Sequence, residues 1–292
     1  MGQKVILDTD IGGDIDDAVA LACFLKSDVE LLGVIAAYSN VRTKAMFARK
    51  FISLSDKSAP VFYGVQKREC TSGGYITEAD YNFLSHSELA CSDAAAGIHP
   101  DGIEFMVSTV LQNPGEVSLI SIGPATNIAR AFLLEPSIAD QVNAVYLMSG
   151  CFDVKSAHWQ LPEHNLRKDK KAVRLLCNQS CKTYFVGKEI GRQACLHLSD
   201  IHSQNDRLLC ELYRQAGIYF NFFTRKQNIT HMCDPLTIGA ILFPELYQFD
   251  AININLDNSG RPHPEKNSLS NVHCCTGVGA EIKEKLLTIL HL

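Results

Sequence analysis

Five aspartates are concentrated between Asp8 and Asp17, close to the N-terminus of the chain. The apolar residues 5–7 before this stretch predict a short buried strand, and the apolar residues 18–21 after it predict a buried helix. The acidic stretch is therefore predicted to be the turn between a strand and a helix. A helix N-cap requires one Asp, whereas five carboxylates in one turn raise one another's pKa unless a cation offsets their charge. Since hard divalent cations prefer oxygen ligands, the turn predicts a Ca²⁺ or Mg²⁺ site.

Strands and helices are predicted to alternate through most of the chain. Residues 29–37, 117–121 and 144–148 are apolar nearly throughout, which is typical of central parallel strands that are covered on both faces. Segments with helical spacing of apolar residues, such as 42–54 and 101–111, lie between the strands. This alternation predicts an α/β fold in a single domain, residues 1–292, with a doubly wound, mostly parallel sheet flanked by helices.

The ligand crevice of such a sheet lies beyond the carboxyl ends of its strands. The acidic turn, Asn40, the turn at Thr126 and the loop after Met148 each follow a predicted strand, so we expect them to converge on one site. Residues 66–97 lack periodicity, and a loop of that length in a compact domain is usually functional. We therefore expect this loop to border the same site.

The C-terminal part of the chain is predicted to add less regular elements. Residues 205–223 have the spacing of a long helix, and residues 281–290 have that of a final amphipathic helix. Asp234 precedes Pro235, which predicts a helix N-cap followed by proline at the first helical position. Residues 251–256 alternate between polar and apolar side chains, which predicts an edge strand.

Composition excludes several classes of protein. The formal net charge is −5 and no long block of Lys or Arg occurs, which argues against nucleic acid as a partner. No apolar run is long enough to span a membrane and no leader pattern is present, so we expect no membrane partner and a cytoplasmic location. The eleven cysteines contain no C-x-x-C pair, which favours reduced core thiols over disulfides or a zinc site. A small molecule is the best remaining ligand.

Four motifs follow one another along the chain. They are Asp-Thr-Asp-Ile-Gly at residues 8–12 with Asp-Asp at 16–17, Gly-Pro-x-Thr-Asn at 123–127, Glu-His-Asn-Leu at 163–166 and Asp-Pro at 234–235. As an ordered set, these motifs resemble those of the nucleoside hydrolase family, the inosine-uridine preferring N-ribohydrolases. The resemblance implies the Rossmann-like fold of that family and hydrolysis of the N-glycosidic bond of ribonucleosides to ribose and free base. It further implies a role in nucleoside salvage and a homodimer or homotetramer.

The resemblance also implies roles for individual residues. One Ca²⁺ would be bound by the carboxylates of Asp10, Asp17 and Asp234 and by the Thr126 carbonyl, with two ribose hydroxyls and a water completing its coordination. Asp10 would also act as general base toward that water. The ribose hydroxyls would be held by four side chains, namely Asp16, Asn40, Glu163 and Asn165.

The nucleobase end of the predicted site departs from the family pattern. Many members place a His immediately before the distal Asp as proton donor to the leaving base, and here that position is Cys233. A thiol is a weak donor, so His231 or His158 is the better candidate for the catalytic acid. Trp159, the only Trp, is a candidate lid that stacks over the base, with core packing as the alternative. The sequence leaves the identity of the nucleobase open.

A non-catalytic module that binds ribose or nucleosides is the alternative interpretation of the same residues. Such a module would keep Asp16, Asn40 and Glu163 for the sugar, without a need for Asp10 as a base. Turnover of a chromogenic riboside distinguishes the enzyme from the binding module.

Overall fold

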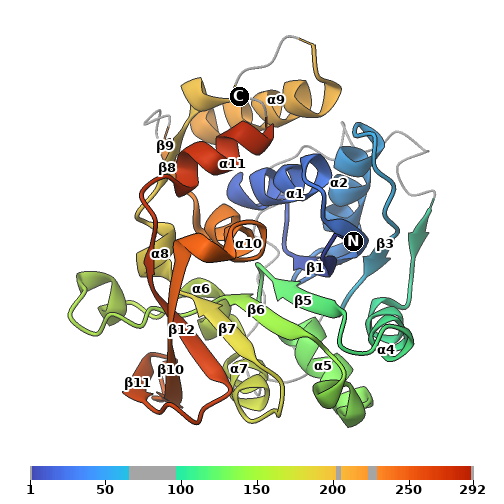
Figure 1. The fold of residues 1–292 in the computed structure, drawn as a ribbon. Coiled ribbons are helices and arrows are strands. Elements are labelled where there is room, and N and C mark those ends of the chain that lie inside the picture. Colours follow the sequence, from blue (N-terminus) through green and yellow to red (C-terminus); the bar gives the residue numbers. More distant parts are fainter. Residues whose placement is uncertain (1, 66–96, 202–204, 223–228, 291–292) are drawn as a thin grey trace.

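The computed structural model describes residues 2–65, 97–201, 205–222 and 229–290, and Figure 1 shows their arrangement. The strands of the main sheet are β1 (Lys4–Thr9), β2 (Glu30–Ala36), β3 (Val61–Tyr63), β4 (Ile98–His99), β5 (Val117–Ser121), β6 (Ala144–Met148), β7 (Thr183–Val186), β10 (Tyr247–Leu256), β11 (Pro262–Lys266) and β12 (Val272–Val278). They form one ten-stranded sheet in the order β11-β10-β12-β7-β6-β5-β1-β2-β3-β4. A separate antiparallel pair consists of β8 (Cys195–His197) and β9 (Ile229–His231).

The order in which the chain adds strands to the main sheet reverses at β1. From β1 the chain adds β2, β3 and β4 on one side and then β5, β6 and β7 on the other. All neighbouring strands from β4 across to β12 pair in parallel, whereas β10 is antiparallel to both β11 and β12. Doubly wound sheets bind ligands at such a reversal, beyond the carboxyl ends of the strands. The end of β1 is therefore the natural position for a site.

Helices cover both faces of the sheet, and each face encloses its own apolar core (Figure 1). On one face lie α1 (Asp16–Lys26), α2 (Val41–Ser53), α9 (Arg207–Phe222), α10 (Cys233–Leu242) and α11 (Ile282–Leu290). On the other face lie α4 (Gly102–Gln112), α5 (Thr126–Leu134) and α7 (Lys170–Cys177). The prediction of an α/β fold with a doubly wound, mostly parallel sheet is confirmed.

Two central helices, α1 and α10, are almost completely buried in the core. Every residue of α1 before Lys26 is buried, and so is every residue of α10 between Cys233 and Leu242. A helix that is apolar on all sides requires packing partners on all sides, and α1 and α10 pack against each other. Their N-terminal ends are therefore held in fixed positions.

The predicted strand at residues 251–256 is present as part of β10, but it is not the outermost strand of the sheet. β10 is longer than predicted: its residues 247–251 pair with β12, and its residues 252–256 pair with β11, which forms the edge. β11 contains Pro262 and Pro264, which cannot donate to a neighbouring strand and are tolerated at an edge. Its prolines and charged residues also explain why the polar-apolar pattern did not reveal it.

The predicted N-cap at Asp234 is also wrong. The N-cap is Met232, two residues earlier than predicted, so that α10 begins at Cys233, and no side chain caps the helix. Asp234 therefore lies within the first turn, and its carboxylate has no capping role.

Two further predictions concern the loop at residues 66–97 and the absence of a membrane-spanning helix. The loop predicted at residues 66–97 lies outside the described residues, apart from Gly97. Within the described ranges, no helix has the length and apolar character needed to cross a membrane.

Candidate functional site

The turn between β1 and α1 is held in place by the side chain of Thr9. Its hydroxyl donates to Asp17 Oδ1 over 2.6 Å and accepts the Ile11 N–H over 3.1 Å. Gly12 has a φ of 103°, in the left-handed region that residues with a Cβ rarely adopt. The chain can therefore double back within a few residues, and Asp17 returns to the end of the strand.

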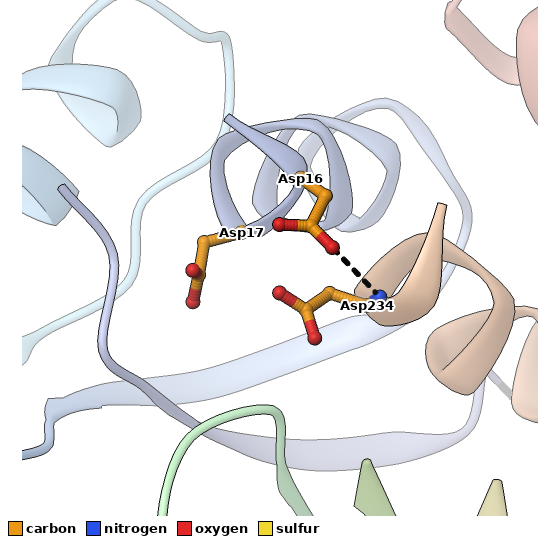
Figure 2. Close-up of side chains that lie close together, drawn as sticks. All are labelled: Asp16, Asp17 and Asp234. Atoms are coloured by element: carbon orange, nitrogen blue, oxygen red, sulfur yellow. Dashed lines mark hydrogen bonds between the residues drawn. The ribbon is translucent and has the colours of Figure 1, made fainter. Parts of the chain in front are cut away.

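Three buried carboxylates meet between the N-terminal ends of α1 and α10 (Figure 2). Asp16 and Asp17 belong to the first turn of α1, and Asp234 belongs to the first turn of α10. One carboxylate oxygen of each residue lies within 4.8 Å of those of the other two. The Asp234 N–H donates to Asp16 Oδ2 over 3.3 Å. The positive ends of two helix dipoles thus face one group of carboxylates. We refer to these three residues as the acidic triad.

The charges around the acidic triad are mostly negative. Burial, followed by the charges of neighbouring aspartates, raises the pKa of all three carboxyls well above the usual range. Lys44 acts in the opposite direction on the pKa of Asp17, and its ammonium donates to the Asp10 carbonyl. A divalent cation would relieve the repulsion, and carboxylate oxygens suit Ca²⁺ or Mg²⁺ better than the softer metals that prefer Cys or His. The residues present therefore fit a metal site.

The acidic triad lines a cavity of about 760 Å³, which is within the size range of small-molecule sites. Six carboxylates contribute to its wall, namely Asp10, Asp14, Asp16, Asp17, Glu163 and Asp234. Aromatic, basic and sulfur-containing side chains complete much of the wall, among them Tyr38, Lys44, His164, Lys188, Arg192, Tyr219, His231 and Cys233. The cavity is thus strongly charged at its carboxylate end and mixed in character elsewhere.

Seven of the ten residues predicted for the site line this cavity, and they are Asp10, Asp16, Asp17, Glu163, Asn165, His231 and Asp234. The other three are not among the residues that line the cavity, and their side chains make contacts within the protein. The Asn40 side chain caps α2 by accepting the Thr43 N–H over 3.2 Å. The Thr126 hydroxyl donates to Asp169 Oδ2 over 2.8 Å, which joins the start of α5 to the N-cap of α7. The Trp159 indole N–H donates to the Pro262 carbonyl over 2.8 Å.

Glu163 and Asn165 are held rigidly at the edge of the cavity. Glu163 is the N-cap of α6 (His164–Lys168), and its carboxylate accepts the N–H groups of Asn165, Leu166 and Gly150 over 2.7, 2.9 and 3.0 Å. Burial raises the pKa of Glu163, and these hydrogen bonds act in the opposite direction. The Asn165 amide donates to the carbonyls of Ile122 and Met148. Ile122 directly follows β5, and Met148 is the last residue of β6. Both side chains are therefore preorganised.

His231 and Cys233 flank the entry to α10. His231 ends β9, and its Nδ1 lies 3.4 Å from the Sγ of Cys195 on the paired strand β8. Burial, followed by the positive charges of Arg192, His158 and Lys188, lowers the pKa of His231. Burial and nearby carboxylates raise the pKa of the Cys233 thiol well above its usual range. Burial therefore favours the uncharged form of both side chains.

Several cavity residues were missed by the sequence reasoning. Lys188 and Arg192 follow β7, so the rule that sites lie at the carboxyl ends of strands could have found them. Lys44 lies one helical turn after Asn40, where no motif marks it. Tyr219 comes from the last turn of α9, and no motif in the sequence marks it.

Comparisons with known proteins agree with this geometry. The family model described as inosine-uridine preferring nucleoside hydrolase matches residues 5–282. A probable uridine nucleosidase 2 of Oryza sativa subsp. japonica is 26% identical over 275 residues, which cover 88% of this chain and 79% of the relative. The inosine-uridine preferring nucleoside hydrolase of Crithidia fasciculata is 24% identical over an alignment of 317 positions, gaps included, which covers 97% of this chain and 94% of the relative.

Solved structures show the same fold. A purine-preferring ribonucleoside hydrolase from Gardnerella vaginalis superposes with a TM-score of 0.80 at 19% identity, over 99% of this chain and 98% of that one. The plant nucleoside hydrolase PpNRh1 superposes with a TM-score of 0.77 at 22% identity, over 99% and 98% of the two chains. Since the family model extends over nearly the whole sequence, the chain belongs to the inosine-uridine preferring nucleoside hydrolase family.

Proposed function

We propose that the protein is a calcium-dependent N-ribosyl hydrolase that cleaves ribonucleosides into ribose and free base. The observation that carries this proposal is the buried acidic triad in the wall of a cavity of about 760 Å³. Burial of three carboxylates is energetically unfavourable unless a cation offsets their charge, and a divalent cation would do so. Family membership supports the reaction class.

The proposed calcium ligands are the carboxylates of Asp10, Asp17 and Asp234 together with the Thr126 carbonyl. A donor set made only of oxygens, in a site that can offer six to eight of them with substrate and water, favours Ca²⁺ over Mg²⁺. When bound, Ca²⁺ would orient the ribose hydroxyls and make a water more acidic. Reconstitution of the chelated protein with Ca²⁺, Mg²⁺ or Mn²⁺, followed by activity measurements, identifies the ion.

The residues of the chain would divide the remaining work. Asp10 accepts the proton of the attacking water as general base. Asp16, Asn40, Glu163 and Asn165 hold the ribose hydroxyls. Cleavage of an N-glycosidic bond passes through an oxocarbenium-like ion, which a ring of carboxylates stabilises electrostatically.

Departure of the base would depend on the other side of the cavity. We assign His231 as the catalytic acid, with Cys195 as the neighbour of its Nδ1 atom. Trp159 is the proposed lid over the base. Its indole is now hydrogen-bonded to Pro262 and lies outside the cavity lining, so stacking on a base would require the turn at Ala157–Gln160 to move.

The test is a hydrolysis panel of purine, pyrimidine and modified ribonucleosides, with the released bases separated by chromatography. We expect turnover of ribonucleosides and a loss of at least about 10²-fold in kcat/KM for the 2′-deoxy analogues, because loss of the 2′-hydroxyl leaves buried polar groups unpaired. Binding of ribonucleosides without any release of base would instead identify a non-catalytic binding protein.

Substitutions at His231 and Cys233 should have different effects. His231→Phe should lower kcat on an ordinary nucleoside by about 10²-fold, whereas Cys233→Ala should cost less than about tenfold. A p-nitrophenyl riboside needs no acid for its leaving group, so its turnover should be insensitive to both changes. Steady-state kinetics on both substrates measure the difference. If Cys233→Ala alone abolishes nucleoside cleavage and spares the activated riboside, the thiol is the acid and the assignment of His231 is wrong.

A glycine beside Asp10 offers a test of how accurately the base must be placed. A Cβ added at Gly123 would lie 2.8 Å from Asp10 Oδ1, so Gly123→Ala should displace this carboxylate. Misplacement of a reacting group by about 1 Å can cost up to about 10²-fold, and we expect kcat to fall by at least about tenfold. Gly217→Ala is the matched control, since a Cβ there meets no atom within 4 Å. Equal kcat values for the two variants would contradict a placed general base.

A further inference from the structure

Two basic side chains in the cavity have no part in the proposed hydrolysis. Lys188 begins the short helix α8 (Lys188–Gly191), and Arg192 directly follows it. Both line the same cavity as the acidic triad. In the part of the chain that the structure describes, neither side chain forms a salt bridge or a side-chain hydrogen bond. The cavity is therefore lined by two positively charged side chains that have no anionic partner among the described residues.

The charges of Lys188 and Arg192 act mainly on cavity groups outside the acidic triad. The charge of Arg192 affects His231 and Cys233, and the charge of Lys188 affects His231 and Glu163. The main charges that act on Asp16, Asp17 and Asp234 are instead those of other acidic groups and of Lys44. The cavity thus has a carboxylate end, where the cation and ribose would bind, and a basic wall formed by Lys188, Arg192 and the neighbouring His231.

Balancing the acidic triad does not explain the basic wall. An ion pair with a carboxylate of the cavity would place nitrogen and oxygen within 4.0 Å, and neither Lys188 nor Arg192 reaches that distance to any described carboxylate. Two neighbouring cations in a partly desolvated wall repel each other and are costly unless an anion joins them. The planar fork of Arg and the point charge of Lys are the usual ligands of carboxylate and phosphate groups.

We propose that Lys188 and Arg192 bind an anionic group of the substrate, so that the preferred substrate is a ribonucleoside with a negative charge outside its ribose ring. This inference rests on the proposed N-ribosyl hydrolysis and specifies its substrate class. The anion has two chemical sources, an acidic substituent on the base or a phosphate on the 5′-oxygen. Both present oxygens of the kind that an Arg-Lys pair binds.

The experiment compares matched neutral and anionic ligands on the full chain with Ca²⁺. Turnover is measured for uridine, 6-carboxyuridine and uridine 5′-monophosphate. Calorimetry measures binding of the products, with orotate against uracil and ribose 5-phosphate against ribose. We expect one anionic member to exceed its neutral parent by at least about tenfold in kcat/KM and in affinity, with an advantage that falls as salt screens the charges. The carboxylated pair identifies an acidic base, and the phosphorylated pair identifies a nucleotide.

Variants assign the preference to the two side chains. Arg192→Met and Lys188→Met should each reduce the anionic-to-neutral ratio by at least about tenfold. Lys171→Met, which removes an exposed positive charge on α7, should leave the ratio unchanged. If uridine is hydrolysed but no anionic ligand exceeds its parent, the inference is wrong and the hydrolase function stands. If no riboside is cleaved but orotate or ribose 5-phosphate binds in an Arg192-dependent manner, the hydrolase function fails and the anion site stands.

Discussion

Replacement of Asp10 by Asn should lower kcat on ribonucleosides by at least about 10²–10⁴-fold, the usual contribution of a general base. The side chains of Asp and Asn have nearly the same shape, so the cavity and the contact between Lys44 and the Asp10 carbonyl should be preserved. The amide cannot accept a proton at neutral pH, and it also removes one negative charge from the proposed calcium ligands. Steady-state kinetics and thermal melting of the variant separate loss of chemistry from loss of folding.

Asp14→Asn is the matched control for this experiment. Asp14 lines the same cavity in the same turn, but its carboxylate accepts the Ile15 N–H over 2.7 Å and the Thr230 hydroxyl over 3.3 Å. It belongs to neither the proposed calcium ligands nor the ribose-binding set, so we expect a change in kcat of less than about tenfold. An Asp10→Asn variant with kcat near that of the parent would remove Asp10 from the chemistry.

The parallel part of the sheet is predictable because strands that are buried on both faces have little room for polar side chains. The predicted strands at residues 117–121 and 144–148 coincide with β5 and β6 residue for residue. β11 is not predictable in this way, since its sequence Pro-His-Pro-Glu-Lys has no apolar pattern. Its strand conformation arises from pairing with β10, and a local pattern does not record that contact.

The carboxylates of the site are predictable as a group but not one by one. Asp8 and Asp10 are two residues apart, yet Asp10 lines the cavity and Asp8 does not. Asp8 is fully buried and accepts hydrogen bonds from the Asn127 amide over 2.6 Å and the Ser121 hydroxyl over 3.2 Å. Burial raises its pKa to about 7. Asp8 thus ties β1 to β5 and α5, a role that depends on neighbours more than a hundred residues away in the sequence.

The basic wall shows the same limit of the sequence. Lys188 and Arg192 belong to a short segment after β7 that contains no recognisable motif. Their position in the cavity becomes evident only in the structure, where His231 from β9 and Cys233 from α10 line the same cavity. Charged residues that come together only in the folded protein have no fixed spacing in the sequence, so no sequence motif identifies them as a group. The carboxylate end of the cavity is predictable because its acidic residues belong to compact motifs that follow strands.

Removal of the divalent cation should abolish turnover and lower the thermal stability of the protein. A ligand at about 100 times its Kd stabilises the folded state by about 2.7 kcal/mol, which corresponds to about 5 °C in Tm for a chain of this size. Asp234→Ala should eliminate both effects of the cation, because it removes a proposed ligand. Glu116→Gln should preserve both, because Glu116 is an exposed acid that pairs with Lys4 at the far end of β1.

The effect of the cation on Tm should also grow with pH. Burial and mutual repulsion raise the pKa of Asp16, Asp17 and Asp234 in the folded state, so the metal-free folded protein binds more protons than the unfolded chain. Its free energy of unfolding therefore decreases as pH rises above the unfolded pKa values. The cation competes with these protons, and the difference in Tm between calcium-loaded and chelated protein should be larger at about pH 8 than at about pH 5.5. Melting curves in Ca²⁺ and in EGTA measure this difference. A difference that is largest at the acidic end, or equal melting and turnover in both solutions at the alkaline end, would contradict a metal bound by the acidic triad.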